Sequence, residues 1–151
     1  MTRPLPPHTR PARMDDVPAL VDLCRQLGYP TDLRSMTERV DRLVARPLVH
    51  RVLVAPTPMD DGRLLGAVHA TRRETIESED YVEIAALIVD EQARCTGVGK
   101  VLVTAVERWT RNLGLGAVRL RSNVVRTGAH EFYQHLGYRV LKQQVSFLKD
   151  L

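Results

Sequence analysis

The sequence predicts an α/β fold with a mixed, mostly antiparallel sheet, one parallel β-α-β step and helices on both faces. Two observations support this fold class. Extended segments over 50–55 and 64–72 flank a tip dense in turn residues, which is typical of a hairpin. A nearly continuous apolar run over 81–89 is followed by a long helical pattern and then by an extended segment over 117–122. A strand, a helix and a strand in that order form a right-handed parallel crossover.

Length and composition favour one domain. The chain has 151 residues, of which 44% are hydrophobic and 26% charged, so it is long enough to bury a core without a metal or disulfide staple. Its two cysteines, Cys24 and Cys95, cannot supply a disulfide framework or a four-ligand zinc site. There is no membrane-length apolar run and no apolar signal core, so we expect a cytoplasmic protein. We expect a flexible segment over 1–7 and one domain over 8–151.

The N-terminal third is predicted to contain a strand and two helices. Residues 8–12 are read as a short first strand. The next helix is predicted over 17–27, because its apolar residues follow the spacing of a buried helical face, and Gly28 ends it. The same spacing recurs over 32–46, where Pro47 ends a second helix.

The C-terminal third is predicted to contain two helices and two further strands. A helix begins in the glycine-containing segment Arg94–Lys100 and ends at Gly114. A short helix follows over 128–136. Two final strands are predicted over 138–141 and 145–148.

The segment Arg94–Lys100 is the sharpest local signal of binding. Gly97 and Gly99 allow a ligand to approach the backbone, and the free N–H groups at a helix N-terminus attract anions. A Walker loop would need Ser or Thr where Val101 stands, and a dinucleotide fingerprint would need Gly where Leu102 stands. The pattern therefore indicates a diphosphate site of another kind, or a turn that merely starts a helix.

The segment Glu83–Gly99 resembles the central motif of the GNAT N-acetyltransferase superfamily, a strand followed by R-x-x-G-x-G. Asn123 followed by 129–138 is similar to the family's second motif, and 9–16 is similar to its first strand and helix. The resemblance covers 8–151. It departs from the family at the residues beside the motif arginine, Ala93 and Cys95, where Gln or Arg and then Gly are frequent.

The resemblance implies that acetyl-CoA is the acyl donor. Backbone groups of the central strand are implied to pair with the pantetheine arm, and N–H groups of the glycine loop to hold the pyrophosphate. Asn123 and the start of the short helix are implied to flank the pantetheine end. The implied cofactor-binding residues are Leu87, Ile88, Val89, Arg94, Cys95, Thr96, Gly97, Val98, Gly99, Lys100, Asn123, Ala129 and Phe132.

Two side chains are candidates for proton transfer. An ammonium group must lose a proton before it can attack a thioester, and a carboxylate can accept that proton directly or through water. Glu83 matches the family's frequent base position, and Tyr133 resembles its tyrosine acid. The alternatives are that Glu83 lies at a solvated strand end and that Tyr133 is a core aromatic. A backbone N–H near Ile88 is a candidate donor to the thioester oxygen.

The expected acceptor is the primary amine of a small molecule. Five carboxylates lie close together in the sequence at Glu74, Glu77, Glu79, Asp80 and Glu83. If they line the acceptor cleft, they favour a cationic acceptor such as a polyamine, an aminoglycoside or a lysine-like amine; otherwise they form a solvated loop.

Other functions remain as alternatives. A GNAT fold without catalysis that binds CoA or a partner, or an enzyme that acetylates a protein amine, fits the same motifs. Nucleic-acid binding is disfavoured, because the basic residues that give the net charge of +4 are scattered and no aromatic pair lies beside them. His130 and His135 do not share a helical face, so no metal site is expected. A homodimer through the late strands is possible by the resemblance.

Overall fold

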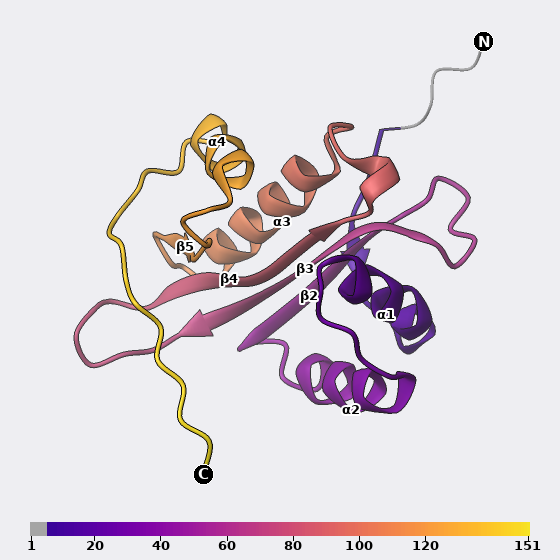
Figure 1. Ribbon diagram of the computed structural model, residues 1–151, viewed down its shortest axis with the longest axis horizontal. Coiled ribbons are helices and arrows are strands. Elements are labelled where there is room, and N and C mark those ends of the chain that lie inside the picture. The colour runs from indigo at the N-terminus through magenta and orange to yellow at the C-terminus, as the bar shows by residue number, and fades with distance from the viewer. Residues whose placement is uncertain (1–5) are drawn as a thin grey trace. The chain divides into compact units, whose positions relative to one another are not determined.

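The computed structural model describes residues 6–151 (Figure 1). The chain packs as two compact units, Met1–Leu120 and Arg121–Leu151, which are described separately below. Most of the segment expected to be flexible, 1–7, lies outside the described residues. No helix within 6–151 has the length and apolar character that a membrane span needs.

The first unit is built on one mixed sheet. Its strands lie in sequence order, and every neighbouring pair is antiparallel except β4 and β5, which are parallel. This arrangement confirms the predicted fold class. The strands are β1 (Arg10–Pro11), β2 (His50–Pro56), β3 (Leu64–Arg73), β4 (Tyr81–Val89) and β5 (Val118–Leu120).

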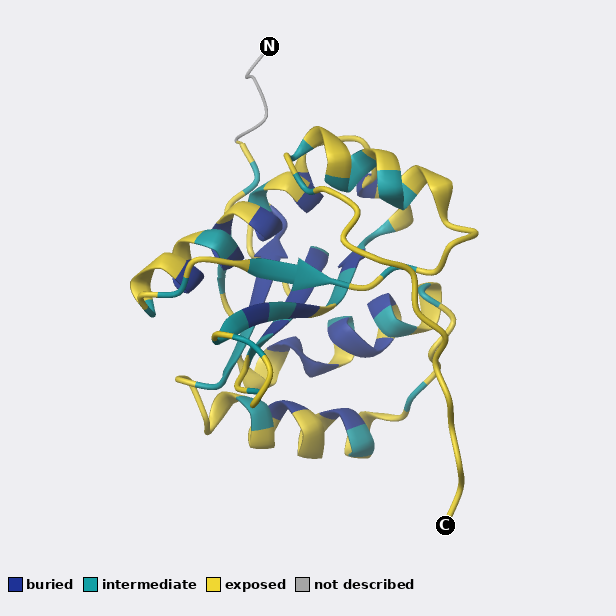
Figure 2. Cartoon of the chain, turned by 90° about the vertical axis from the view of Figure 1, so that its left-hand side faces the viewer, coloured by how far each residue is buried: buried dark blue, intermediate teal, exposed yellow. Residues whose placement is uncertain are grey.

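Helices cover both faces of this sheet. The helices α1 (Val17–Gln26) and α2 (Leu33–Val44) lie on one face, and α3 (Val98–Asn112) lies on the other (Figure 1). Asp32 starts α2 as predicted, since its side chain accepts a hydrogen bond of 2.8 Å from the Ser35 N–H. Figure 2 shows the buried residues gathered in the central strands and on the helix surfaces that face them.

The strand register assigns side chains to the two faces. Val54, Ala67 and Ile88 pack with apolar residues of α1 and α2. Because side chains alternate along a strand, His69 and Thr71 share the face of Ala67, and His50 shares the face of Val54. Half of this face is therefore an apolar core, and the other half carries polar side chains.

A β-bulge bends β4 between these two halves. His69 lies opposite Ala86 and Ala70 lies opposite Ile84, so Ala85 is an extra residue in β4. The pairing of β4 with β5 covers only Val82–Ile84. Beyond Ile84, the edge of β4 that faces β5 has no strand partner among the described residues.

A buried carboxylate anchors β1 to the start of α1. Asp16 is 3% exposed and accepts two hydrogen bonds from the Arg10 guanidinium, at 2.8 and 2.9 Å. Burial alone works to raise the pKa of Asp16, but the hydrogen bonds from Arg10 and from the Arg13 N–H outweigh it and lower the pKa below its usual value.

The second unit contains one helix, α4 (Thr127–His135), close to its predicted range. The two strands predicted over 138–141 and 145–148 are wrong, because no described residue of these segments belongs to a strand. Val145 and Phe147, in the second of these segments, are 77% and 91% exposed. A sequence pattern alone does not make a strand, which also needs a neighbour to satisfy its backbone N–H and C=O groups.

Candidate active site

The candidate base, Glu83, lies in a row of side chains that crosses four strands. Thr71 lies opposite both His50 and Glu83, and Glu83 lies opposite Arg119. Directly opposite residues point to the same face of a sheet. The row therefore runs along the α1 and α2 face in the order His50, Thr71, Glu83 and Arg119.

Glu83 is largely shielded from solvent. Its side chain is 13% exposed, and one carboxylate oxygen lies 3.7 Å from Nε of Arg73. Its neighbours along the strand, Val82 and Ile84, are buried and point to the opposite face. This position does not fit a carboxylate at a solvated strand end, and it allows Glu83 to accept a proton from a bound group.

The end of β4 offers backbone groups for a ligand. Leu87, Ile88 and Val89 follow the bulge and pair with β3 on one edge only. A short helical turn, η2 (Glu91–Ala93), then leads into the glycine loop. An extended ligand can hydrogen-bond to such an open strand edge as an additional strand would.

The glycine loop lies at the N-terminus of α3. Gly97 has a φ of 89° and precedes the helix, and no side chain of the described residues caps it. The first N–H groups of α3 therefore face outward, as an anion site requires. Arg94, Cys95, Thr96 and Lys100 are all exposed around them. The donor set fits a diphosphate group such as that of acetyl-CoA.

Cys95 stands where the GNAT motif frequently has glycine, and its backbone conformation is strained. Its φ is 63°, in the left-handed region that glycine tolerates best. Cys95 and Cys24 are both free thiols. A residue other than glycine in this conformation costs about 1–2 kcal/mol. The loop thus keeps its shape at position 95 without the glycine frequent in the family.

Gln26 hydrogen-bonds to the segment before the glycine loop, and Gly66 allows close packing beside it. The sequence pattern did not indicate either residue. The Gln26 side chain donates to Asp90 at 2.9 Å and accepts from the Glu91 N–H at 3.0 Å. A Cβ on Gly66 would lie 2.8 Å from the Ile88 carbonyl oxygen and 3.0 Å from side-chain carbon atoms of Val98 and Leu102. A glycine inside a strand is a signal of such close approach, whereas an exposed Gln gives none.

The second unit carries the remaining candidate residues. Asn123 accepts a hydrogen bond of 3.2 Å from the Val125 N–H in the turn before α4. Ala129, Phe132 and Tyr133 are half-buried. The Tyr133 ring makes edge contacts with Phe132 and Tyr138, at centroid distances of 5.0 and 5.8 Å.

Tyr133 has the protonation state that a proton donor needs. Burial raises the pKa of its hydroxyl, and the nearby charge of Arg126 opposes this only in part. The phenol therefore stays protonated at neutral pH. Its ring contacts are equally compatible with a packing role, so the hydroxyl is the group that distinguishes the two roles.

A histidine pair on the polar half of the sheet was also missed. Nδ1 of His50 lies 3.2 Å from Nε2 of His69, and the ring centroids are 5.3 Å apart. Burial, followed by the neighbouring His50, lowers the pKa of His69 to about 4. Burial and then the charges of Arg46 and Arg42 lower the pKa of His50. The signal in the sequence was His69, a polar residue at a position of β3 that faces the same side as the buried Ala67.

The acidic run is partly neutralised by arginine. Arg72 contacts Asp80 at 2.6 Å and Glu74 at 3.3 Å. Glu77 and Glu79 are exposed. The structure thus brings only Glu83 of this run into the row described above.

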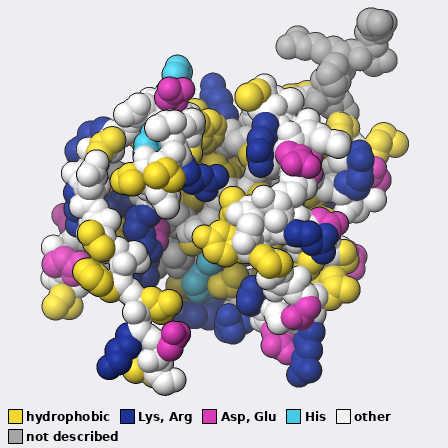
Figure 3. All heavy atoms as spheres, viewed as in Figure 1, with side chains coloured by type: hydrophobic (Ala, Val, Ile, Leu, Met, Phe, Trp, Pro, Cys, Tyr) yellow, Lys and Arg dark blue, Asp and Glu magenta, His cyan; other side chains and the backbone are white. Residues whose placement is uncertain are grey.

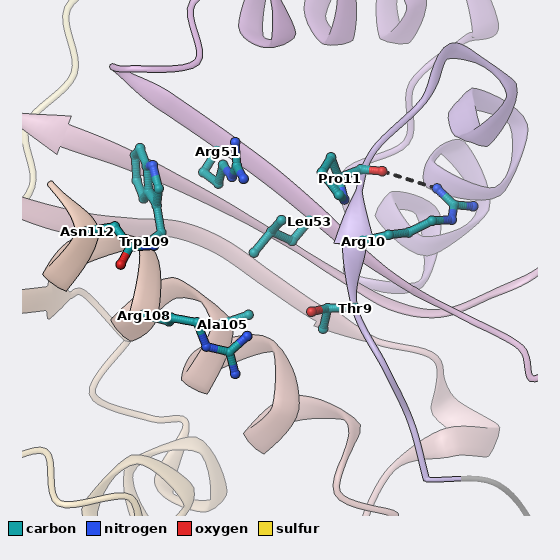
Figure 4. Close-up of a pocket in the computed structure, with 9 residues that line it drawn as sticks. All are labelled: Thr9, Arg10, Pro11, Arg51, Leu53, Ala105, Arg108, Trp109 and Asn112. Atoms are coloured by element: carbon teal, nitrogen blue, oxygen red, sulfur yellow. Dashed lines mark hydrogen bonds between the residues drawn. The ribbon is translucent and has the colours of Figure 1, made fainter.

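A cavity of about 180 Å³ lies elsewhere, between β1, β2 and the C-terminal half of α3 (Figure 4). Its residues face α3, so it is on the opposite side of the sheet from Glu83. Arg51 and Arg108 lie on opposite sides of Leu53 in Figure 4 and do not converge on one point. This cavity is not part of the candidate active site.

Within the first unit, β4 carries Glu83 and then the open edge, and it leads through η2 into the glycine loop. A family model described as the acetyltransferase (GNAT) family matches residues 24–138. The chain is also 38% identical over 64 residues to YhdJ, an uncharacterized N-acetyltransferase of Bacillus subtilis (strain 168). That match covers 42% of this chain and 45% of the relative, which is less than half of each.

Solved structures share the fold at low identity. A glucosamine-6-phosphate N-acetyltransferase from Arabidopsis thaliana matches with a TM-score of 0.82 and 17% identity, over 97% of this chain and 100% of that one. An aminoglycoside antibiotic 6'-N-acetyltransferase from Acinetobacter haemolyticus matches with a TM-score of 0.80 and 18% identity, over 95% and 99%. Since the family model covers most of the chain, and the sheet and helices agree with it, the protein belongs to the GNAT acetyltransferase family.

Proposed function

We propose that the protein transfers an acetyl group from acetyl-CoA directly to the primary amine of a small molecule, and that residues 8–151 act as one acetyltransferase domain. The observation that carries this proposal is the position of Glu83. It is shielded from solvent on β4, one residue before the pairing with β5 ends, and the same strand leads to the uncapped start of α3.

The donor site is proposed along β4 and the loop that follows it. Backbone groups of Leu87, Ile88 and Val89 are suited to an extended pantetheine arm, and the N–H groups between Arg94 and Lys100 are suited to a pyrophosphate. Asn123, Ala129 and Phe132 complete the proposed set. When bound, acetyl-CoA supplies an activated thioester, and an N–H near Ile88 is the proposed donor to its carbonyl oxygen.

Glu83 is proposed as the base. A primary amine is an ammonium ion at neutral pH, so it lacks the lone pair that attacks a carbonyl carbon. Glu83 accepts one of its protons, directly or through a water molecule, the neutral amine then attacks, and the nitrogen loses its second proton to water as the amide forms. The low exposure of the carboxylate supports this role, because a shielded charge interacts more strongly with a bound ammonium than a solvated one does.

Tyr133 is proposed as the acid. Breaking the thioester leaves a thiolate, which needs a proton to become a stable thiol. A phenol that stays protonated at neutral pH is suited to donate it, and the raised pKa of Tyr133 supports that role.

The function is tested by screening amines for the release of free thiol from acetyl-CoA. We expect at least one small amine to release thiol in step with the appearance of its N-acetyl product, measured by mass spectrometry. A reaction without amine measures hydrolysis. Binding of acetyl-CoA without acetylation of any small amine would favour a CoA-binding module or a protein acceptor instead.

A further inference from the structure

The row through Glu83 is basic at both ends. Arg119 lies opposite Glu83 on one side, and its guanidinium stacks over the Tyr81 ring at 4.1 Å. On the other side, beyond Thr71, lie His50 and its partner His69. Figure 3 shows histidine atoms next to Lys and Arg side chains in the lower middle of the molecule, where β2 begins in the matching view of Figure 1.

The charges near the histidine pair are positive. Arg42 and Arg46 both lower the pKa of His50, and no carboxylate acts on it in the opposite direction. On the same face of the sheet, Glu83 is accompanied by Arg73 at 3.7 Å and by Arg119. Apart from Glu83, this half of the face therefore presents cations and neutral imidazoles.

The acidic residues that suggested a polycationic acceptor are engaged elsewhere. Asp80 and Glu74 contact Arg72, whose side chain alternates to the α3 face of β3. A second ammonium group on the acceptor would meet the field of Arg42 and Arg46 near the histidine pair. An anionic group would be attracted by the same field.

We propose that the amine acceptor also carries an anionic group, a carboxylate or a phosphate, and that this group binds at the His50–His69 pair while the amine lies at Glu83. This inference rests on the proposed function. His50 is two strands from Glu83 along the row, a separation of roughly 10 Å at the backbone, and His69 lies on the adjacent strand, two residues along β3 from Thr71. The acceptor therefore has its amine and its anionic group several bonds apart.

The pair has the chemistry that such a group needs. Each neutral imidazole carries one N–H, and the contact between His50 and His69 uses only one nitrogen of each ring. An anion accepts a hydrogen bond from the pair and favours its protonated form, so binding draws a proton onto the imidazoles. Thr71 lies opposite His50, and the charges that act on His50 are those of Arg46 and Arg42.

Three amines with the same six-carbon chain provide the test: aminohexanoate, aminohexanol and diaminohexane, which end in an anion, a neutral hydroxyl and a cation. We expect kcat/KM for aminohexanoate to exceed that for the other two by about tenfold or more. Aminohexyl phosphate, compared with aminohexanoate, tells whether phosphate or carboxylate is preferred. Equal rates for all the amines, or a preference for diaminohexane, would overturn the proposal.

Substitutions of the two histidines test whether the anionic group of the acceptor binds there. His69→Leu should lower the ratio of kcat/KM for aminohexanoate to kcat/KM for aminohexanol to about one, and His50→Leu should do the same if His69→Leu does not fold. Arg111→Gln is the matched control, because it removes an exposed charge from α3 on the opposite face. An unchanged advantage in a folded histidine variant would contradict the assignment.

A binding measurement separates this proposal from the proposed function. Without acetyl-CoA, aminohexanoate should shift the ring-proton NMR signals of His50 and His69 and raise their apparent pKa, whereas aminohexanol should not. Absence of any shift at saturating aminohexanoate would reject the anion site, even if the protein acetylates other amines. Failure of the proposed function would instead appear as no amine-dependent thiol release.

Discussion

Glu83 on β4 lies directly opposite Arg119 on β5, and the two strands stop pairing one residue later, at Ile84 and Leu120. Ala85, the next residue of β4, is the extra residue that forms the bulge in the pairing with β3. The carboxylate thus lies one row before the pairing of β4 with β5 ends, close to the edge at which β4 becomes available to a ligand. Backbone geometry places the proposed base and the proposed donor site on one strand.

Gly97→Ala should weaken acetyl-CoA binding by about tenfold, or roughly 1.4 kcal/mol. The φ of 89° is strained for alanine, so the start of α3 must shift and its N–H groups lose their alignment. Calorimetry measures the change. Gly28→Ala is the matched control, because Gly28 has a φ of 91° and open space around it, at the end of α1. Equal affinity in both variants would count against the loop.

Gly66→Ala should lower the free energy of unfolding by about 1–3 kcal/mol. The new methyl group would lie 2.8 Å from the Ile88 carbonyl oxygen, so β3 must move away from β4 or α3 must move outward. Urea unfolding measures the loss. Gly116→Ala should change stability little, since a Cβ there meets nothing within 4 Å. Equal stability of the two variants would show that the packing relaxes freely.

Tyr133→Phe should lower kcat by roughly 10- to 1,000-fold and leave the melting temperature and acetyl-CoA affinity nearly unchanged. The substitution removes the hydroxyl and keeps the ring contacts with Phe132 and Tyr138. Single-turnover kinetics are needed, because slow product release could hide a loss in chemistry. Tyr29→Phe is the control: it makes the same substitution at an exposed tyrosine and should leave kcat unchanged. Normal single-turnover rates would assign Tyr133 to packing alone.

His69 should make the protein less stable as the pH falls from 6.5 to about 4. Its folded-state pKa is lower than its unfolded value, so the unfolded chain binds more protons in this window and acid favours unfolding. Above pH 6.5 both states are neutral at this position and the effect is absent. Unfolding measured across this range should show a shallower loss for His69→Gln than for the original chain. Parallel curves would mean that His69 is not held in its neutral form.

The sequence predicted elements well where periodicity and a stop signal agreed. The strand over 81–89 and the hairpin before it were recovered, because long apolar runs and turn residues act locally. The strands predicted over 138–141 and 145–148 failed, since a strand depends on a distant partner that a local pattern cannot reveal. The bulge at Ala85 depends in the same way on the register with β3.

The candidate site was predictable only in part. Glu83 and the glycine loop stood out because a carboxylate in an apolar strand and closely spaced glycines are local signals. His50 and His69 lie far apart in the sequence, and only the pairing of β2 with β3 brings their rings together. The Gln26 contact with Asp90 likewise joins a helix end to a distant loop.

The role of Glu83 as the base is tested most directly by the pH dependence of kcat/KM in Glu83→Gln. If Glu83 accepts the ammonium proton, the variant should lose most activity below the pKa of the acceptor amine and regain part of it as the pH rises, because the amine then loses its proton to water. Glu38→Gln, at an exposed carboxylate of α2, is the control. We expect the ratio of wild-type to variant kcat/KM to fall steadily with rising pH. Wild-type turnover by Glu83→Gln across the whole range would contradict it.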